Sequence, residues 1–228
     1  MLPQPDSAPT NSAHADRLLE LMYRVMEYRS DEIYHRLEKV GRTASMLHVD
    51  VLLLIYHFAR FGPGNILEIG PYIGGSTIAA AFGARESNTD KKIISIEAGG
   101  RLKHSRIPSR NIIKDLRRNL SRFGVSEDVT LINGSSFDEK AKLTVRQILN
   151  GGQIGLFIFD ADGGVRRDLD SFRDLLADHC WVVIDDYFGP QAKAAPIRAQ
   201  VDELVSVGRL VPFGYYGWGT WIGQWCGK

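Results

Sequence analysis

The sequence predicts an α/β fold in which a doubly wound, mostly parallel sheet of seven strands carries helices on both faces. Two observations lead to this prediction. After Gly64, short apolar runs alternate with segments whose apolar residues recur at helical spacing. Three of the apolar runs, which begin at Asn65, Ile154 and Trp181, are uninterrupted, as is typical of parallel strands buried on both faces.

The region before the first strand is expected to be helical. Residues 1–15, rich in Pro, Ser, Asn and Ala, are predicted to form a flexible tail. Apolar residues then recur at helical spacing from Asp16 to Arg42, and a second helix is expected over 43–61, where Gly62-Pro63-Gly64 ends it. We therefore expect an N-terminal helical cap over 16–62 and a main domain over 63–228.

The main domain is expected to contain the following elements. Strands are predicted over 65–69, 92–97, 129–133, 154–160, 181–185, 209–213 and 218–224, with the C-terminal strand antiparallel. Helices are predicted over 76–85, 111–123, 136–150, 165–177 and 195–207. The Ser136-Phe-Asp-Glu139 spacing is that of a capping box, which would begin the third of these helices at Ser136.

Composition and charge exclude several classes of protein. The 228 residues are 44% hydrophobic and 24% charged, which is ordinary for a globular protein. A net charge of +1 argues against a dedicated nucleic-acid or membrane-surface binder. The longest apolar run is too short to span a bilayer. The two cysteines lack metal-ligand spacing and fit free thiols in a reducing cytoplasm.

Small residues follow the first predicted strand, where open α/β sheets bind their ligands. Gly70, Gly74 and Gly75 permit a tight turn and a close approach of a ligand to the backbone. Their spacing is not the Gly-x-Gly-x-x-Gly of dinucleotide binders, and no Lys follows as in a P-loop. The loop therefore suits a ligand without a pyrophosphate.

The next two strand ends carry polar groups that suit a nucleoside. The second strand ends in Glu97, whose carboxylate can accept hydrogen bonds from both hydroxyls of a ribose. The third strand ends in Asn133-Gly134-Ser135-Ser136, small polar groups that suit the edge of an adenine.

Together these segments resemble the Rossmann-like class I S-adenosylmethionine-dependent O-methyltransferases. More narrowly, they resemble the metal-dependent catechol and caffeoyl-CoA O-methyltransferases and their bacterial natural-product relatives. The segment from Leu67 to Ser76 matches the family's Leu-Glu-hydrophobic-Gly-x-Tyr-x-Gly-x-Ser loop, and Glu97 matches its ribose-binding acid. Val129 to Ser136 matches the strand that leads to the adenine pocket, and the resemblance extends over about 65–187.

The resemblance implies that 63–228 is a cofactor-binding methyltransferase domain. It implies that S-adenosylmethionine is bound around its methionine part by Glu68, Gly70, Tyr72, Gly74 and Ser76. It places Ser135, Ser136 and Phe137 at the adenine and Glu97 at the ribose.

Acidic residues follow the fourth and fifth predicted strands. Asp160 and Asp162 follow the fourth, and Asp185 and Asp186 follow the fifth. Neighbouring strand ends lie roughly 5 Å apart, so these carboxylates would repel one another unless a cation lies among them. The cofactor's sulfonium and a hard divalent ion, Mg²⁺ or Ca²⁺, are both candidates.

The resemblance implies a divalent metal held by Asp160, Asp185 and Asp186, with Asp186 in place of the commoner Asn. Asp160 is also predicted to contact the cofactor and to act in catalysis. Asp162 is expected only to cap the segment that follows it.

The general base is not evident from the sequence. Many relatives carry a His or Lys just after the acids of the fourth strand, where this chain has Gly163 and Gly164. A metal-bound hydroxyl has a lowered pKa and needs little help from a base. Alternatively, His104 in the polar stretch 98–108 is the candidate catalytic residue, or it is simply a solvated loop residue.

We therefore expect methyl transfer from S-adenosylmethionine to a hydroxyl of a small molecule, assisted by Mg²⁺ or another divalent cation. Neither a nucleic acid nor a membrane is expected as a partner, and the N-terminal helix could serve a homodimer. Three alternatives stay open: a metal-independent N- or O-methyltransferase, a nicotinamide-dependent oxidoreductase on a similar sheet, and a non-catalytic binding module.

Overall fold

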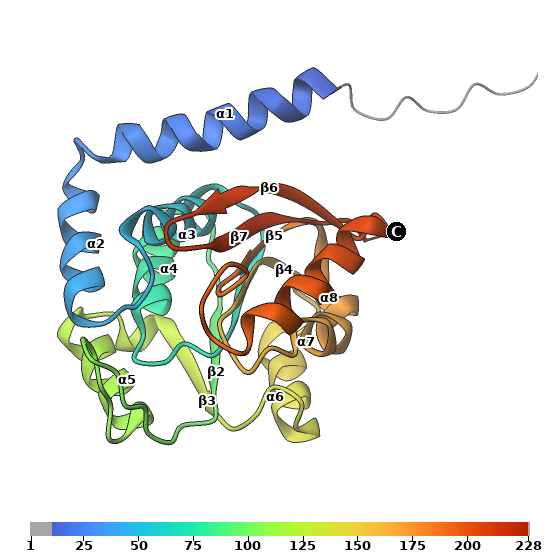
Figure 1. The fold of residues 1–228 in the computed structure, drawn as a ribbon. Helices are drawn as coiled ribbons and strands as arrows, with labels where there is room; N and C mark the ends of the chain where they lie inside the picture. Colours follow the sequence, from blue (N-terminus) through green and yellow to red (C-terminus); the bar gives the residue numbers. More distant parts are fainter. Residues whose placement is uncertain (1–10, 228) are drawn as a thin grey trace, which may run out of the picture.

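The computed structural model describes residues 11–227, which form a sheet with helices on both of its faces (Figure 1). The strand order is β3-β2-β1-β4-β5-β7-β6. The first five strands pair in parallel, and β7 is antiparallel to both of its neighbours, which confirms the predicted sheet. The strands are β1 (Asn65–Ile69), β2 (Ile93–Glu97), β3 (Val129–Asn133), β4 (Ile154–Phe159), β5 (Leu176–Ile184), β6 (Leu210–Tyr216) and β7 (Thr220–Trp225).

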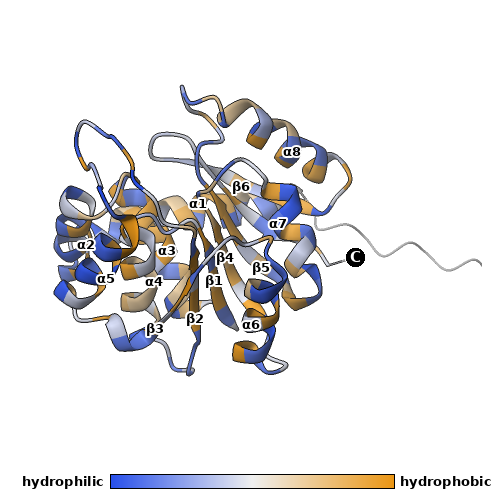
Figure 2. Ribbon diagram, turned by 90° about the horizontal axis from the view of Figure 1, so that it is seen from below, coloured by the Kyte–Doolittle hydropathy of each residue, from blue (hydrophilic) through white to orange (hydrophobic). Residues whose placement is uncertain are grey.

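The helices fall into two groups on opposite sides of the sheet, α2 to α5 on one side and α6 to α8 on the other (Figure 2). They are α1 (Asn11–Tyr28), α2 (Glu32–Thr43), α3 (Val49–Phe61), α4 (Gly75–Arg85), α5 (Ile112–Arg122), α6 (Glu139–Leu149), α7 (Val165–Phe172) and α8 (Ala194–Ser206). Short 3₁₀ turns lie at Ser126–Asp128 and Arg173–Leu175. Among the described residues, no helix combines the length and the apolar character that a membrane crossing needs.

Each central strand contributes to both halves of the core, because successive side chains point to opposite faces. In β1, Ile66 packs in the half covered by α1 to α5, whereas Leu67 packs in the half covered by α6 to α8. Ile158 and Phe157 divide in the same way in β4. The uninterrupted apolar runs of the sequence therefore reflect burial on both faces.

The N-terminal region differs from the prediction in its helix boundaries. The single helix expected from Asp16 to Arg42 is two helices, because the chain turns at 29–31. There the Ser30 hydroxyl donates to the Glu27 carbonyl, and Asp31 becomes the N-cap of α2. The helix expected from residue 43 begins at Val49, where the His48 ring accepts the N–H of Asp50.

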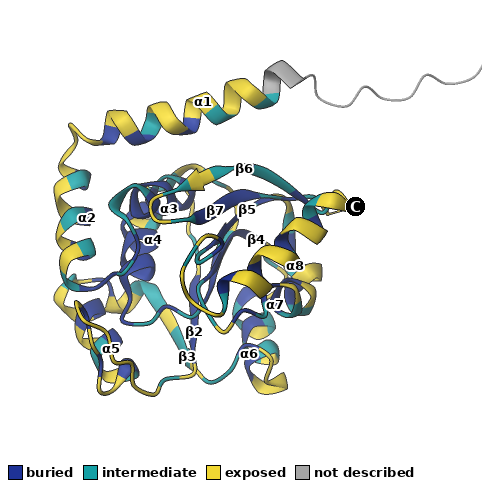
Figure 3. Ribbon diagram, in the orientation of Figure 1, coloured by how far each residue is buried: buried dark blue, intermediate teal, exposed yellow. Residues whose placement is uncertain are grey.

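Helix α1 begins at Asn11, so residues 11–15 are helical and are not part of a tail as predicted. The rest of the predicted tail, residues 1–10, lies outside the described residues. Much of α1 is exposed, in contrast to the buried α3 and α4 (Figure 3). Helix α3 packs so closely on α4 that a Cβ at Gly83 would lie 2.2 Å from the carbonyl oxygen of Tyr56.

Three boundaries in the main domain also differ from the prediction. The capping box at Ser136 does not form, and α6 begins at Glu139 after its N-cap Asp138. The helix expected to reach residue 177 ends earlier, and β5 begins at Leu176, which pairs with Ile154. The register of this pairing then shifts at a bulge in β5, where His179 has a φ of 59°. The turn between the last two strands lies at 217–219 instead of 214–217, since Tyr216 pairs with Thr220.

Candidate functional site

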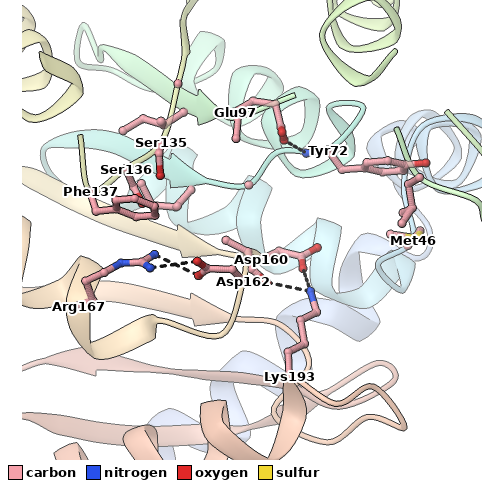
Figure 4. Close-up of a pocket in the computed structure, with 17 residues that line it drawn as sticks. Met46, Tyr72, Glu97, Ser135, Ser136, Phe137, Asp160, Asp162, Arg167 and Lys193 are labelled. Carbon is pink, nitrogen blue, oxygen red and sulfur yellow. Dashed lines mark hydrogen bonds and ion pairs between the residues drawn. The ribbon is translucent and has the colours of Figure 1, made fainter. Parts of the chain in front are cut away.

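A cavity of about 290 Å³ lies at the carboxyl ends of β1, β2 and β4 (Figure 4). We call it the strand-tip cavity. Its volume is close to the lower end of the range for small-molecule sites. It is lined by Met46, Ile69, Gly70, Tyr72, Ile96, Glu97, Ala98, Leu102, Gly134, Ser135, Ser136, Phe137, Asp160, Ala161, Asp162, Arg167 and Lys193. The predicted ligand-binding edge of the sheet is therefore hollow.

The loop after β1 forms one wall of this cavity. Gly70 has a φ of +81°, and a Cβ on it would lie 2.2 Å from the carbonyl oxygen of Asp160. Only glycine fits there, and its bare backbone lets a ligand approach closely. Tyr72 is also left-handed, with a φ of 51°, and its hydroxyl donates to the carbonyl of Ile107 at 2.5 Å. Tyr72 thereby fastens the polar stretch 98–108 over the cavity.

Glu68 and Ser76 lie behind this wall and do not line the cavity. The fully buried Glu68 carboxylate accepts hydrogen bonds from the hydroxyls of Ser76, Thr77 and Ser95. Burial raises the pKa of Glu68, against the effect of those three donors. Glu68 thus ties β1, β2 and the first turn of α4 together beneath the loop.

Gly74 is likewise outside the cavity lining. It is the N-cap of α4 in a left-handed conformation, and a Cβ there would lie 2.7 Å from the Leu116 side chain. Glu68, Gly74 and Ser76 were predicted to surround the methionine part of the cofactor. In the structure they support the loop that lines the cavity and do not line it themselves.

Glu97 presents its carboxylate at the cavity wall, at the end of β2. Its Oε2 accepts the N–H of Tyr72 at 3.1 Å, and its Oε1 accepts the N–H of Gly99 at 2.7 Å. Burial raises the pKa of this carboxyl, and the two backbone donors oppose that rise. A carboxylate oxygen has two lone pairs, so each oxygen can still accept a hydroxyl. The arrangement suits a vicinal diol.

Ser135, Ser136 and Phe137, which are predicted to contact the adenine, line the cavity beyond β3. The Phe137 ring is partly exposed and lies 4.4 Å from the Arg167 guanidinium. Arg167, which was not predicted from the sequence, makes two hydrogen bonds of 3.0 Å to Asp162 and two more, of 2.8 and 3.5 Å, to the buried Asp168. A planar ring, with a guanidinium over one of its faces, and two serines therefore line this end of the cavity.

Asp162 behaves as expected for a capping residue. Its Oδ1 accepts the N–H of Gly164, the residue that precedes α7. The hydrogen bonds from Arg167 are the main cause of the lowered pKa of Asp162.

The acids that follow β4 and β5 converge. The N–H of Asp160 donates to the Ile69 carbonyl, and the N–H of Asp185 donates to the Phe159 carbonyl, so both acids continue the sheet. Asp186 is left-handed, with a φ of 56°. Asp160, Asp185 and Asp186 each bring one carboxylate oxygen within 4.8 Å of the others. Oxygen-only donors at this spacing suit a hard divalent cation.

Burial and mutual repulsion shape the ionisation of these acids. Burial, followed by the charge of Asp160, raises the pKa of Asp185 to about 7. The Asp185 Oδ1 accepts the hydroxyl of Thr220 at 2.6 Å. Burial also raises the pKa of Asp160, against the effect of the Lys193 ammonium.

Lys193, also not identified from the sequence, places its ammonium within this acid cluster. The Nζ atom lies 2.9 Å from Asp160 Oδ1, 2.7 Å from Asp186 Oδ2 and 3.1 Å from the Ala161 carbonyl oxygen. Burial acts to lower the pKa of Lys193, but the two carboxylates outweigh it and raise that pKa. Lys193 is therefore a charged part of the site.

A second cavity of about 380 Å³, which we call the acidic cavity, shares Met46 and Asp160 with the strand-tip cavity. Its remaining lining comprises His104, Arg106, Asp185, Asp186, Phe188, Gly189, Pro190, Gln191 and Trp218. Phe188 and Trp218 are exposed aromatic side chains, whereas Tyr187, Trp221 and Trp225 are core residues. Two cavities thus meet at one carboxylate.

His104 lies in the acidic cavity, as the prediction for a catalytic residue requires. Its Nδ1 accepts the N–H groups of Arg106 and Ile107, each at 3.2 Å. In the neutral ring this leaves the proton on Nε2, so in this geometry His104 can donate a hydrogen bond but has no free lone pair with which to accept a proton. Its role as the general base stays a prediction.

Comparison with known families supports the interpretation of the segments at the strand ends as methyltransferase motifs. A family model described as a methyltransferase domain matches residues 67–187, more than half of the chain. A comparison with curated proteins found no match.

Several solved structures share the fold. O-methyltransferase TomG from Streptomyces achromogenes, in complex with SAM, is 17% identical with a TM-score of 0.58, over 90% of this chain and 96% of TomG. SAH-bound methyltransferase PaMTH1 from Podospora anserina is 19% identical with a TM-score of 0.58, over 97% of this chain and 99% of PaMTH1. An O-methyltransferase from Bacillus cereus in complex with SAH is 16% identical with a TM-score of 0.55, over 96% of this chain and 92% of the Bacillus protein.

Proposed function

The chain belongs to the methyltransferase-domain family, and from this membership we propose that it transfers a methyl group from S-adenosylmethionine to a hydroxyl of a small molecule. The observation that carries the proposal is the pair of cavities that meet at Asp160. One cavity presents the ribose-type acid Glu97, and the other presents the acid cluster. The TomG complex with SAM and the two SAH-bound structures support the choice of methyl donor.

The strand-tip cavity suits the methyl donor in three respects. Glu97 has a free lone pair on each oxygen for the two ribose hydroxyls. Gly70 lines the cavity where the methionine part would lie, and only glycine fits at this position because a Cβ would strike the Asp160 carbonyl. The Phe137 ring offers its face to the adenine, with Ser135 and Ser136 beside it.

The acceptor is proposed to enter through the acidic cavity. Its hydroxyl oxygen attacks the methyl carbon as the carbon–sulfur bond breaks in line, the hydroxyl proton is released to solvent, and the methyl group moves across the boundary formed by Met46 and Asp160. The chain contributes by orienting the two reactants and by excluding water from between them. The exposed Phe188 and Trp218 rings offer an apolar surface for the body of the acceptor.

Asp160, Asp185 and Asp186 would hold a divalent ion, because three carboxylates within 4.8 Å form an oxygen-only donor set. When bound, such an ion supplies Lewis acidity that binds the acceptor hydroxyl and lowers its pKa. Asp185 is held toward this position by its hydrogen bond with Thr220.

Metal-independent transfer is the second candidate, and the position of Lys193 favours it. The ammonium already neutralises part of the acid cluster, through its contacts with Asp160 and Asp186. In that case the acids would orient a hydroxyl or an amine without an ion.

The test is methyl transfer to a panel of catechols and other hydroxylated small molecules, with product mass and methyl position determined. We expect O-methylated product in the presence of Mg²⁺, loss of at least about tenfold of the rate after treatment with a chelator, and recovery when Mg²⁺ is returned. A rate that survives complete removal of divalent ions would exclude the metal role and select the second candidate. Absence of any methylated product with every acceptor, with or without ions, would count against methyl transfer itself.

A further inference from the structure

Lys193 places a cation among the carboxylates that are proposed to hold the divalent ion. It immediately precedes α8, and its side chain reaches back over the strand ends toward Asp160 (Figure 4). Its ammonium has three oxygen neighbours: it donates to Asp160 Oδ1 and to the Ala161 carbonyl, and it forms an ion pair with Asp186 Oδ2. Lys193 is therefore held in place by three contacts.

The oxygens that hold the ammonium are those that a divalent ion would need. Asp160 and Asp186 are two members of the three-carboxylate cluster, and Lys193 bridges them at 2.9 and 2.7 Å. An ion bound to the cluster would lie among these same oxygens. The ammonium and a doubly charged ion would then be close neighbours in a half-buried site, where like charges repel strongly.

The surroundings offer the cluster no other close cation. Among residues 11–227, the ion pairs of Asp160 and Asp186 are with Lys193 alone. Arg106 lines the same cavity, but its guanidinium donates to the Ser45 carbonyl at 2.9 Å. His104 lines the cavity with its Nδ1 turned to the backbone of its own loop. Arg167 lines the strand-tip cavity, and its ion pairs are with Asp162 and Asp168, which are not members of the cluster.

We propose that Lys193 is a tethered competitor for the divalent ion: its ammonium occupies the cation position of the acid cluster and must leave before an ion binds. The cluster thereby keeps a compensating charge when no ion is present, which avoids the cost of unpaired buried carboxylates. The same contact lowers the affinity for the ion, because binding includes the work of removing Lys193. Binding of an ion is then coupled to the conformation of the chain at the start of α8, because Lys193 immediately precedes that helix. The inference rests on the proposed function only in taking this cluster as the metal site.

The test compares the affinity of the full chain for Mg²⁺ and for Mn²⁺ in wild type, Lys193→Met, Lys193→Arg and Lys140→Met, by calorimetry. Methionine keeps much of the length and the apolar stem of lysine but removes the charge. Lys140 is an exposed lysine on α6 and serves as the matched control. We expect Lys193→Met to bind each ion at least about tenfold more tightly than wild type, and Lys140→Met and Lys193→Arg not to gain affinity.

Thermal unfolding supplies a second readout that does not depend on activity. Without ions, Lys193→Met is expected to melt below wild type, since its acids have lost their partner. Added Mg²⁺ is expected to raise the melting temperature of Lys193→Met more than that of wild type, because tighter binding to the native state stabilises it more. Lys193→Arg, which keeps the charge, is expected to resemble wild type in both measurements.

Equal or weaker ion affinity in Lys193→Met than in wild type would overturn the inference. Titration of the same samples with S-adenosylhomocysteine separates this failure from a failure of the proposed function. If S-adenosylhomocysteine binds and neither protein binds an ion, competition at the cluster is refuted while the assignment of the methyl donor stands. If S-adenosylhomocysteine does not bind, the proposed function itself fails.

Discussion

Replacing Glu97 by Ala is expected to weaken the binding of S-adenosylhomocysteine by roughly 10²-fold or more. Glu97 faces the strand-tip cavity, and each of its oxygens has one lone pair beyond its backbone partner. Hydrogen bonds to a charged group contribute about 1.5–3 kcal/mol each, and about 1.4 kcal/mol is a factor of ten in affinity. Two such bonds to a ribose account for the expected loss, which calorimetric titration measures.

A second variant and a control separate binding from folding. Glu97 also holds the N–H groups of Tyr72 and Gly99, so its loss could disturb the loop. Glu97→Gln keeps the size and one acceptor, and it is expected to fall between wild type and Glu97→Ala. Glu127, an exposed acid before β3, supplies the control Glu127→Ala, which should bind as wild type does. Wild-type affinity in Glu97→Ala would refute the assignment of the ribose site.

Replacing Asp185 by Asn is expected to have the opposite pattern: methyl transfer falls by roughly 10²-fold or more, while S-adenosylhomocysteine binds as tightly as before. Asp185 lines the acidic cavity and not the strand-tip cavity. Asparagine keeps the shape and can still accept the Thr220 hydroxyl, so the change removes mainly the charge. Steady-state rates at saturating donor, with Mg²⁺ titrated, measure the effect.

The matched control is Asp178→Asn. Asp178 lies in the first half of β5, and its side chain is 65% exposed. Its replacement is expected to leave the rate and the affinity for Mg²⁺ unchanged. A near wild-type rate in Asp185→Asn, together with unchanged Mg²⁺ affinity, would show that the acid cluster does not hold a catalytic ion.

The ligand-binding edge could be predicted because parallel strands bring their carboxyl ends to one edge of a sheet. Glu97 and Asp160 end or follow strands that periodicity identifies, so their convergence follows from the fold. Glu68 shows the limit of this reasoning. Its place in the motif is correct, but the alternation of a strand turns its side chain into the core, where it binds three hydroxyls.

The residues that were not predicted come from segments whose path the sequence pattern does not determine. Met46 lies in an irregular connection between two helices, and Lys193 lies immediately before α8, 33 residues from Asp160 in sequence. The sequence held one signal for Lys193. Residues 187–193 directly follow the acids of β5, and Lys193 is the one cation in this short segment, so its ammonium can reach those acids.

Helix boundaries were the least accurate part of the prediction, because local hydrogen bonds between polar side chains and the backbone override apolar spacing. Val25, Ile33 and Val40 keep the spacing of one continuous helix, yet the chain turns at Ser30 and Asp31. At Ser136, the capping box is not used, and Asp138 accepts the N–H of Ser135 instead.

The most direct test of the account is calorimetric titration of the wild-type chain with S-adenosylhomocysteine and, separately, with NADH. We expect S-adenosylhomocysteine to bind at one site with micromolar affinity and NADH to show no specific binding, since the loop from Gly70 to Gly75 lacks the dinucleotide spacing. Specific binding of NADH without binding of S-adenosylhomocysteine would contradict the account.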